Sequence, residues 1–182
     1  MNEGEPTEGK MKVLSLWQPW ASAVAVGAKR VETRSWRTTY RGLIAIHAAK
    51  RRVIGELIYF RSCWNWCGAL ASLGVTMGNG PTLDHLLPFG AVVAVADLVD
   101  CLPTDSFTVG LLDRKHGQEP YQWTERQMGD FSPGRYGWVF ENIRALAKPL
   151  PMCGHQGLWT PTSNEVAGIQ KRLSGEPPRG GV

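Results

Sequence analysis

Residues 14–41 of this chain read LSLWQPWASAVAVGAKRVETRSWRTTYR, and this stretch decides the fold. A strand is expected over 12–17, after which Pro19 stands where a helix accepts proline as its first residue. The apolar residues 20–26 predict a short buried helix that ends at Gly27 in a left-handed conformation. Alternating residues over 31–36 and a nearly continuous apolar run over 42–49 predict two further strands.

The rest of the chain predicts more strands than helices. Helical spacing indicates a helix over 51–60, and glycine, proline and asparagine indicate a loop over 74–88. Strands are expected at 90–99, 136–146 and 156–160, with a polar excursion at about 101–135 that carries at most a short helix near 123–128. Thr162 and Glu165 form a capping box that begins a helix extending to about Leu173. We therefore expect an α+β fold, a small mixed or antiparallel β-barrel with peripheral helices.

Length and composition indicate one domain. With 182 residues and 43% hydrophobic content, the chain can bury one core. We expect this domain at 11–173, between a disordered leader at 1–10 and a disordered tail at 174–182. No disulfide framework and no span of about 18 apolar residues is visible. The expected protein is cytoplasmic, with reduced thiols, no membrane partner and no cofactor.

Basic residues gather in one part of the sequence. The net charge is +4, and over 29–52 a single acid, Glu32, stands among the basic residues Lys29, Arg30, Arg34, Arg37, Arg41, Lys50, Arg51 and Arg52. Such a run favours an anionic partner such as nucleic acid. The alternative is an ordinary solvated charged face.

Four segments resemble the ASCH domain, the family related to the homology domain of activating signal cointegrator 1. They are LSLWQPWASAVAVGAKRVETRSW, YRGLIAIHAAK, GAVVAVADLVD and YGWVFENIRALAKPLPMCGHQGLW, within about 12–159. The most specific parts are LWQPW, the G-x-K-x-x-E-x-R octet at Gly27–Arg34 and the closing QGLW. The resemblance implies a β-barrel similar to the PUA domain, an RNA-binding fold, with a cleft lined by the octet. It implies RNA, single-stranded nucleic acid or a nucleoside-type ligand, and some members resembling the family hydrolyse acylated cytidine or cut RNA.

The octet also has a direct physical interpretation. On a strand, Arg30, Glu32 and Arg34 share one face, so that Glu32 lies between two guanidinium groups. Lys29 joins that face only if the chain bends between 29 and 31, which Gly27 makes possible. The alternative is a strand-face ion cluster that contributes little energy.

The predicted ligand-binding residues combine cations with aromatic rings. Arginine and lysine bind phosphates, and an exposed tryptophan stacks an unpaired base. The set is Trp17, Gln18, Lys29, Glu32, Arg34, Trp36, Arg37, Arg41 and His47. Gln18 is proposed to contact a base edge, whereas His47 in an apolar strand is more commonly a core histidine, and most of the tryptophans are expected in the core. A protein-interaction role would instead depend on an exposed apolar patch.

A catalytic interpretation would use Lys29 and Glu32. An amidohydrolase of this family would use the lysine to activate a threonine three residues later, but Glu32 occupies that position here. The carboxylate also favours a protonated Lys29, which suits an anion anchor better than a base. A ribonuclease would need an acid and a base such as Glu32 and His47. No metal is expected, because the x3 spacing of Cys63 and Cys67 lacks a zinc-knuckle pattern.

Overall fold

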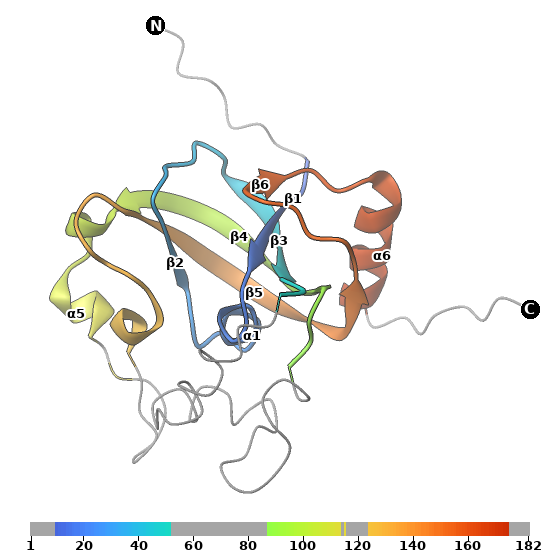
Figure 1. Cartoon of the computed structure of the whole chain (residues 1–182), viewed down its shortest axis with the longest axis horizontal. Coiled ribbons are helices and arrows are strands. Elements are labelled where there is room, and N and C mark those ends of the chain that lie inside the picture. Colours follow the sequence, from blue (N-terminus) through green and yellow to red (C-terminus); the bar gives the residue numbers. More distant parts are fainter. Residues whose placement is uncertain (1–9, 52–86, 114, 116–123, 175–182) are drawn as a thin grey trace, which may run out of the picture.

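The computed structural model describes residues 10–51, 87–113, 115 and 124–174. These residues form a six-stranded sheet in the order β2-β5-β4-β3-β1-β6. The strands are β1 (Lys12–Leu16), β2 (Val31–Arg34), β3 (Gly42–Ala48), β4 (Ala91–Pro103), β5 (Tyr136–Pro151) and β6 (Leu158–Trp159). β1 pairs with β3 in parallel and all the other pairings are antiparallel. The sheet is mixed and curls around its core, so the α+β prediction is confirmed (Figure 1).

Short helices lie around this sheet. They are α1 (Trp20–Ala25), α5 (Val109–Leu112), α6 (Ser163–Leu173) and the 3-10 turns Thr104–Ser106 and Glu125–Met128. The predicted capping box begins α6, where Thr162 accepts from the backbone N–H of Glu165 at 3.3 Å. No helix in the described part of the chain is long and apolar enough to cross a membrane.

The central strands bury both of their faces. One core lies on the side of α1 and includes Leu14, Ile46 and the fully buried Trp138. A second core includes Val13 and Ala45, and Ile169 of α6 completes it. Successive residues of a strand point to opposite faces, so each buried face requires its own apolar set. This explains the nearly continuous apolar runs of β3 and β4.

The local predictions differ from the structure at several boundaries. Gly27 ends the α1 segment with a φ of +74°, as predicted. Pro19 is not the first helical residue but the residue that precedes α1, after a cis Gln18–Pro19 bond. β4 and β5 extend beyond their predicted ends at 99 and 146, because the end of each strand pairs with the beginning of the other. Consequently residues 101–103 belong to β4 rather than to the excursion. Most of the helix predicted over 51–60 and of the loop predicted over 74–88 lies outside the described residues. The same holds for the leader predicted at 1–10, except residue 10, and for the tail predicted at 174–182, except residue 174.

Candidate nucleic-acid interface

Lys29 is brought to the site by the turn that follows α1. The backbone N–H groups of Ala28 and Lys29 both donate to the carbonyl of Ala23, at 2.9 and 3.1 Å, which folds the chain back under the helix. The Lys29 side chain is 0% exposed. Its ammonium donates to the backbone oxygens of Val31 and Met128, at 2.5 and 2.7 Å. The bend that Gly27 makes possible therefore buries this cation.

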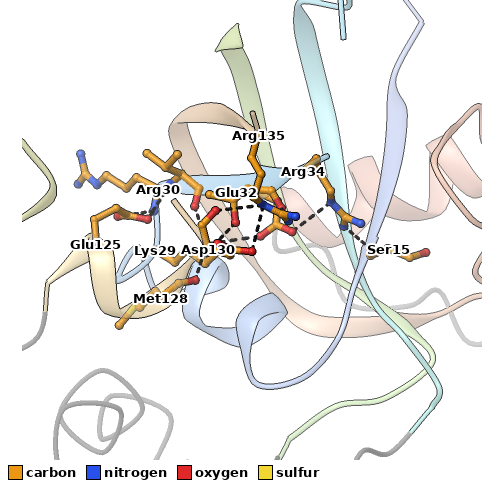
Figure 2. A network of polar contacts seen from close by, with 11 residues as sticks. Ser15, Lys29, Arg30, Glu32, Arg34, Glu125, Met128, Asp130 and Arg135 are labelled. Carbon is orange, nitrogen blue, oxygen red and sulfur yellow. Dashed lines mark hydrogen bonds and ion pairs between the residues drawn. The ribbon is translucent and has the colours of Figure 1, made fainter. Parts of the chain in front are cut away.

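Glu32 lies between two cations, although not the two expected. Its Oε2 is 3.4 Å from Lys29 Nζ and its Oε1 is 3.1 Å from Arg34 Nε (Figure 2). The Arg30 side chain is exposed, so Lys29 takes the place predicted for Arg30. Arg34 Nε is buried without a well-aligned hydrogen bond, although it is close to Glu32. Arg34 Nη2 donates to the backbone oxygen of Ser15 at 3.0 Å, which joins β2 to β1.

The excursion returns across β2 and forms one wall of the site. The buried Glu125 carboxylate accepts from the backbone N–H groups of Arg30, at 3.0 and 3.1 Å, and of Val31, at 2.8 Å. The Asp130 N–H donates to Thr33 Oγ1 at 2.9 Å. These bonds, with that from Lys29 to Met128, fasten residues 125–130 beside the octet (Figure 2). The Thr33 hydroxyl oxygen therefore already accepts a hydrogen bond from the wall.

A first cavity of about 470 Å³ opens between β1, β2 and this wall. Two carboxylates line it, Glu32 and Asp130, together with the cation Arg34. Hydrogen bonds from the Ser132 side chain and backbone lower the pKa of Asp130. Trp17 and Trp20 supply the aromatic part of the lining, and Trp17 is 43% exposed. Lys29 is buried and is not part of the lining, but it contacts Glu32, which is.

A second cavity, of about 510 Å³, lies against the first. The two share Ser15, Trp17 and Arg34 in their linings. Lys50 and His155 also line the second cavity, and no carboxylate is found among the described residues that surround it. Carboxylates therefore line the first cavity, where Glu32 pairs with Arg34 and Asp130 pairs with Arg135, and are absent from the described lining of the second.

His47 lies in the lining of the second cavity as a neutral, fully bonded ring. Its Nε2 is 3.0 Å from the Met152 carbonyl oxygen, which only accepts, so Nε2 carries the proton. Nδ1 therefore accepts from the Ser15 hydroxyl at 3.1 Å. Burial lowers the pKa of His47 and the nearby His155 lowers it further, whereas the bond to Met152 opposes both effects. His47 is thus a buried histidine that also borders a cavity.

Besides Lys29, four predicted ligand-binding residues line neither cavity. Gln18 is buried and caps α1, with its amide donating to Ser22 Oγ and to Pro88 O and accepting from the Ser22 N–H. Trp36 packs edge-on against Trp138 at 4.6 Å and is 38% exposed. The remaining two are Arg37, whose side chain is exposed, and Arg41, which forms an ion pair with Asp100 at 2.9 Å.

The basic run does not form one continuous surface. Lys29 is buried and Arg41 is paired elsewhere, while Arg52 lies outside the described residues. Arg34 and Lys50 gather at the second cavity, and the Arg51 guanidinium lies 5.5 Å from the centre of the Trp17 ring. Three cations of the run, Arg34, Lys50 and Arg51, therefore lie near Trp17.

The candidate metal ligands form no cluster in the described part of the chain. Cys63 and Cys67 lie outside the described residues. Cys101 is a buried free thiol and Cys153 an exposed one. No group of three or more histidine, cysteine, aspartate or glutamate side chains that could hold a metal occurs among the described residues.

Sequence reasoning missed residues that complete the site from distant segments. Glu125, Ser15, Lys50 and Asp130 do not belong to the predicted ligand-binding set. The only sequence pattern that indicated structure in this wall was the short helix expected near 123–128, where the 3-10 turn Glu125–Met128 lies. Gly154 is also essential to the geometry, since a Cβ there would lie 2.4 Å from His47 Cε1.

Comparison with known proteins identifies the family. The ASCH domain model matches residues 14–149. Activating signal cointegrator 1 of mouse and of human are 26% and 25% identical to this chain over 160 residues, which cover 88% of this chain but only 24% of those proteins. Crystal structures of the ASCH protein of Zymomonas mobilis, as a mutant and without a stated mutation, superpose with a TM-score of 0.50 at 16% and 17% identity. They cover 90% and 89% of this chain and 98% and 94% of theirs. The chain belongs to the ASCH domain family.

Proposed function

We propose that this protein binds RNA or another single-stranded nucleic acid in the two adjoining cavities. The observation that carries the proposal is the exposed Trp17 ring beside Arg34 and Lys50, because an aromatic face between cations suits a base and its phosphate. Membership of the ASCH family, with its PUA-like fold, supports a nucleic-acid ligand. A nucleoside-type small molecule would use the same Trp17 and Glu32 surfaces.

The proposed roles of the site residues follow from their contacts. Trp17 stacks a base, Arg34 binds an anionic group, and Glu32 accepts a hydrogen bond while it orients Arg34. Lys29 acts through Glu32, because its ammonium is enclosed by two backbone oxygens and that carboxylate. Trp36, Arg37 and Arg41 would contact only a longer RNA that extends past the cavities.

Titration of a labelled single-stranded RNA tests this proposal. The Arg34→Ala, Arg41→Ala double variant is expected to bind more weakly and with a smaller salt dependence, because phosphate contacts release bound counterions. Arg144→Ala is the matched control, since it removes an exposed arginine that lines neither cavity. Unchanged RNA affinity in the folded double variant would exclude the binding proposal.

An enzymatic alternative is a hydrolase acting on acylated cytidine or on RNA. Its supporting observation is the hydroxyl–imidazole pair of Ser15 and His47 at the second cavity, together with Glu32 at the first. The enclosure of Lys29 counts against its use as a base. Incubation with N4-acetylcytidine and with single-stranded RNA, followed by product analysis, tests the alternative. Absence of turnover of both would exclude it and leave the binding proposal intact.

A further inference from the structure

The two cavities share a wall but are lined by different charged groups, with carboxylates in the first cavity alone among the described residues. The first presents the carboxylates of Glu32 and Asp130, and the second presents Lys50 and His155. Arg34 borders both, and its contacts with Glu32 at 3.1 Å and with the Ser15 oxygen at 3.0 Å hold it at the boundary. A ligand that spans the boundary therefore meets carboxylates at one end and cations at the other.

Trp17 lies at the boundary between the two cavities, where such a ligand would pass from one to the other. Its ring belongs to both linings and is 43% exposed. Arg51 lies near the ring at 5.5 Å, which brings further positive charge to the boundary. A planar group stacked on Trp17 would present its edge to one cavity and its substituents to the other.

Residues 154–157 form part of the wall of the second cavity. Gly154 approaches the second cavity so closely that a Cβ would lie 2.4 Å from His47 Cε1 and 3.1 Å from Ser15 Oγ. This approach brings His155 to the cavity wall. The Ser15 hydroxyl and the neutral His47 ring carry no charge, because the hydroxyl bonds to Nδ1 of the ring and Nε2 donates to the Met152 carbonyl. Anion binding there would consequently depend on Lys50, Arg34 and His155.

We propose, building on the proposed function, that the second cavity is a phosphate subsite and the first a base subsite. A nucleotide is then held in one direction, with its base on Trp17, its polar edge toward Glu32 and its phosphate toward Lys50. A carboxylate accepts from an exocyclic amino group and repels a carbonyl oxygen. The base subsite therefore favours cytosine, adenine or guanine over uracil.

The phosphate subsite is tested with cytidine and cytidine monophosphates carrying the phosphate on the 5′ or the 3′ oxygen. The wild-type protein is expected to bind one monophosphate at least about tenfold more tightly than cytidine, since charge-assisted phosphate bonds are strong. Lys50→Ala should remove most of this difference. Lys148→Ala is the control, because Lys148 is exposed and lines neither cavity. Equal loss in the two variants, or no phosphate effect in the wild type, would overturn the assignment.

The base subsite is tested with short homopolymeric RNAs. Wild-type protein is expected to bind oligo(C) and oligo(A) at least about fivefold more tightly than oligo(U), in line with the discrimination of a polar base contact. Glu32→Gln should reduce this preference. Asp130→Asn, at an exposed residue of the same cavity, is a second variant that should also reduce it. Equal affinity for all three RNAs overturns the base subsite but leaves the proposed function standing. Failure to bind any of them overturns both.

Discussion

Lys29 shows how a charged side chain becomes part of the interior. The ammonium is fully buried, and its partners are two backbone oxygens and the Glu32 carboxylate. A buried charge is tolerated only when it is paired and hydrogen-bonded. The lysine of the octet therefore stabilises the junction between the octet and the returning wall.

Replacing Lys29 by methionine is expected to lower the free energy of unfolding by about 1–3 kcal/mol, because it removes the donor to two backbone oxygens and leaves Glu32 with Arg34 as its one remaining cation partner. The Lys29→Met, Glu32→Gln double variant should lose less than Lys29→Met alone. Denaturant unfolding measures both, with Arg30→Met as an exposed neighbouring control. Wild-type stability in Lys29→Met would contradict the structural role of this cation.

His47 predicts a pH dependence of stability. Its pKa is lowered in the folded protein, chiefly by burial, so the unfolded chain binds a proton more readily. The free energy of unfolding should therefore fall as the pH drops below about 6.5, by at most about 1.4 kcal/mol per pH unit from this group. Urea unfolding between about pH 7.5 and about pH 5.5 should show a smaller fall in His47→Gln. An identical fall in both proteins would assign the effect to other groups.

At the scale of elements, a buried carboxylate helps to fasten the wall formed by residues 125–130. Glu125 is 7% exposed and accepts from the backbone N–H groups of Arg30 and Val31. It fastens a segment to β2 from 94 and 95 residues away along the chain. Together with the bonds of Met128 and Asp130, this contact positions one side of the first cavity.

Glu125→Ala is expected to lower the free energy of unfolding by about 1–3 kcal/mol, because it leaves buried N–H groups without an acceptor. Glu125→Gln keeps one side-chain oxygen and should lose less. Hydrogen exchange should quicken at 128–130 in Glu125→Ala, but not in Glu141→Ala, which alters an exposed carboxylate. Unaltered exchange in the first variant would show that the wall is held by other contacts.

The elements also show what the sequence could and could not predict. The bend after Gly27 follows from local chemistry, so the approach of Lys29 to Glu32 was predictable. The contact between Ser15 and His47 was not, because it arises from the parallel register of β1 and β3, which pairs these two residues. Spacing within one segment gives no information about such register. The Glu125 contact and the close approach of Gly154 are unpredictable for the same reason.

At the scale of the whole molecule, strand pairing divides the basic run into residues with different tasks. Lys29 is buried and Arg41 pairs with Asp100, whereas Arg34 and Lys50 meet at the second cavity. The number of basic residues in the run is therefore larger than the number that face the proposed binding site. The proposed binding site is the smaller region where the two cavities meet at Trp17.

The most direct test of this proposed site is RNA affinity after removal of the shared aromatic ring. Trp17→Ala should weaken binding of a short single-stranded RNA by at least about fivefold, since a base stacked on an aromatic side chain contributes about 1–3 kcal/mol. Trp36→Ala is the matched control for a short RNA, because Trp36 is similarly exposed but lines neither cavity. Anisotropy titrations of the folded variants should show the loss in Trp17→Ala alone. Wild-type affinity in Trp17→Ala would contradict the account.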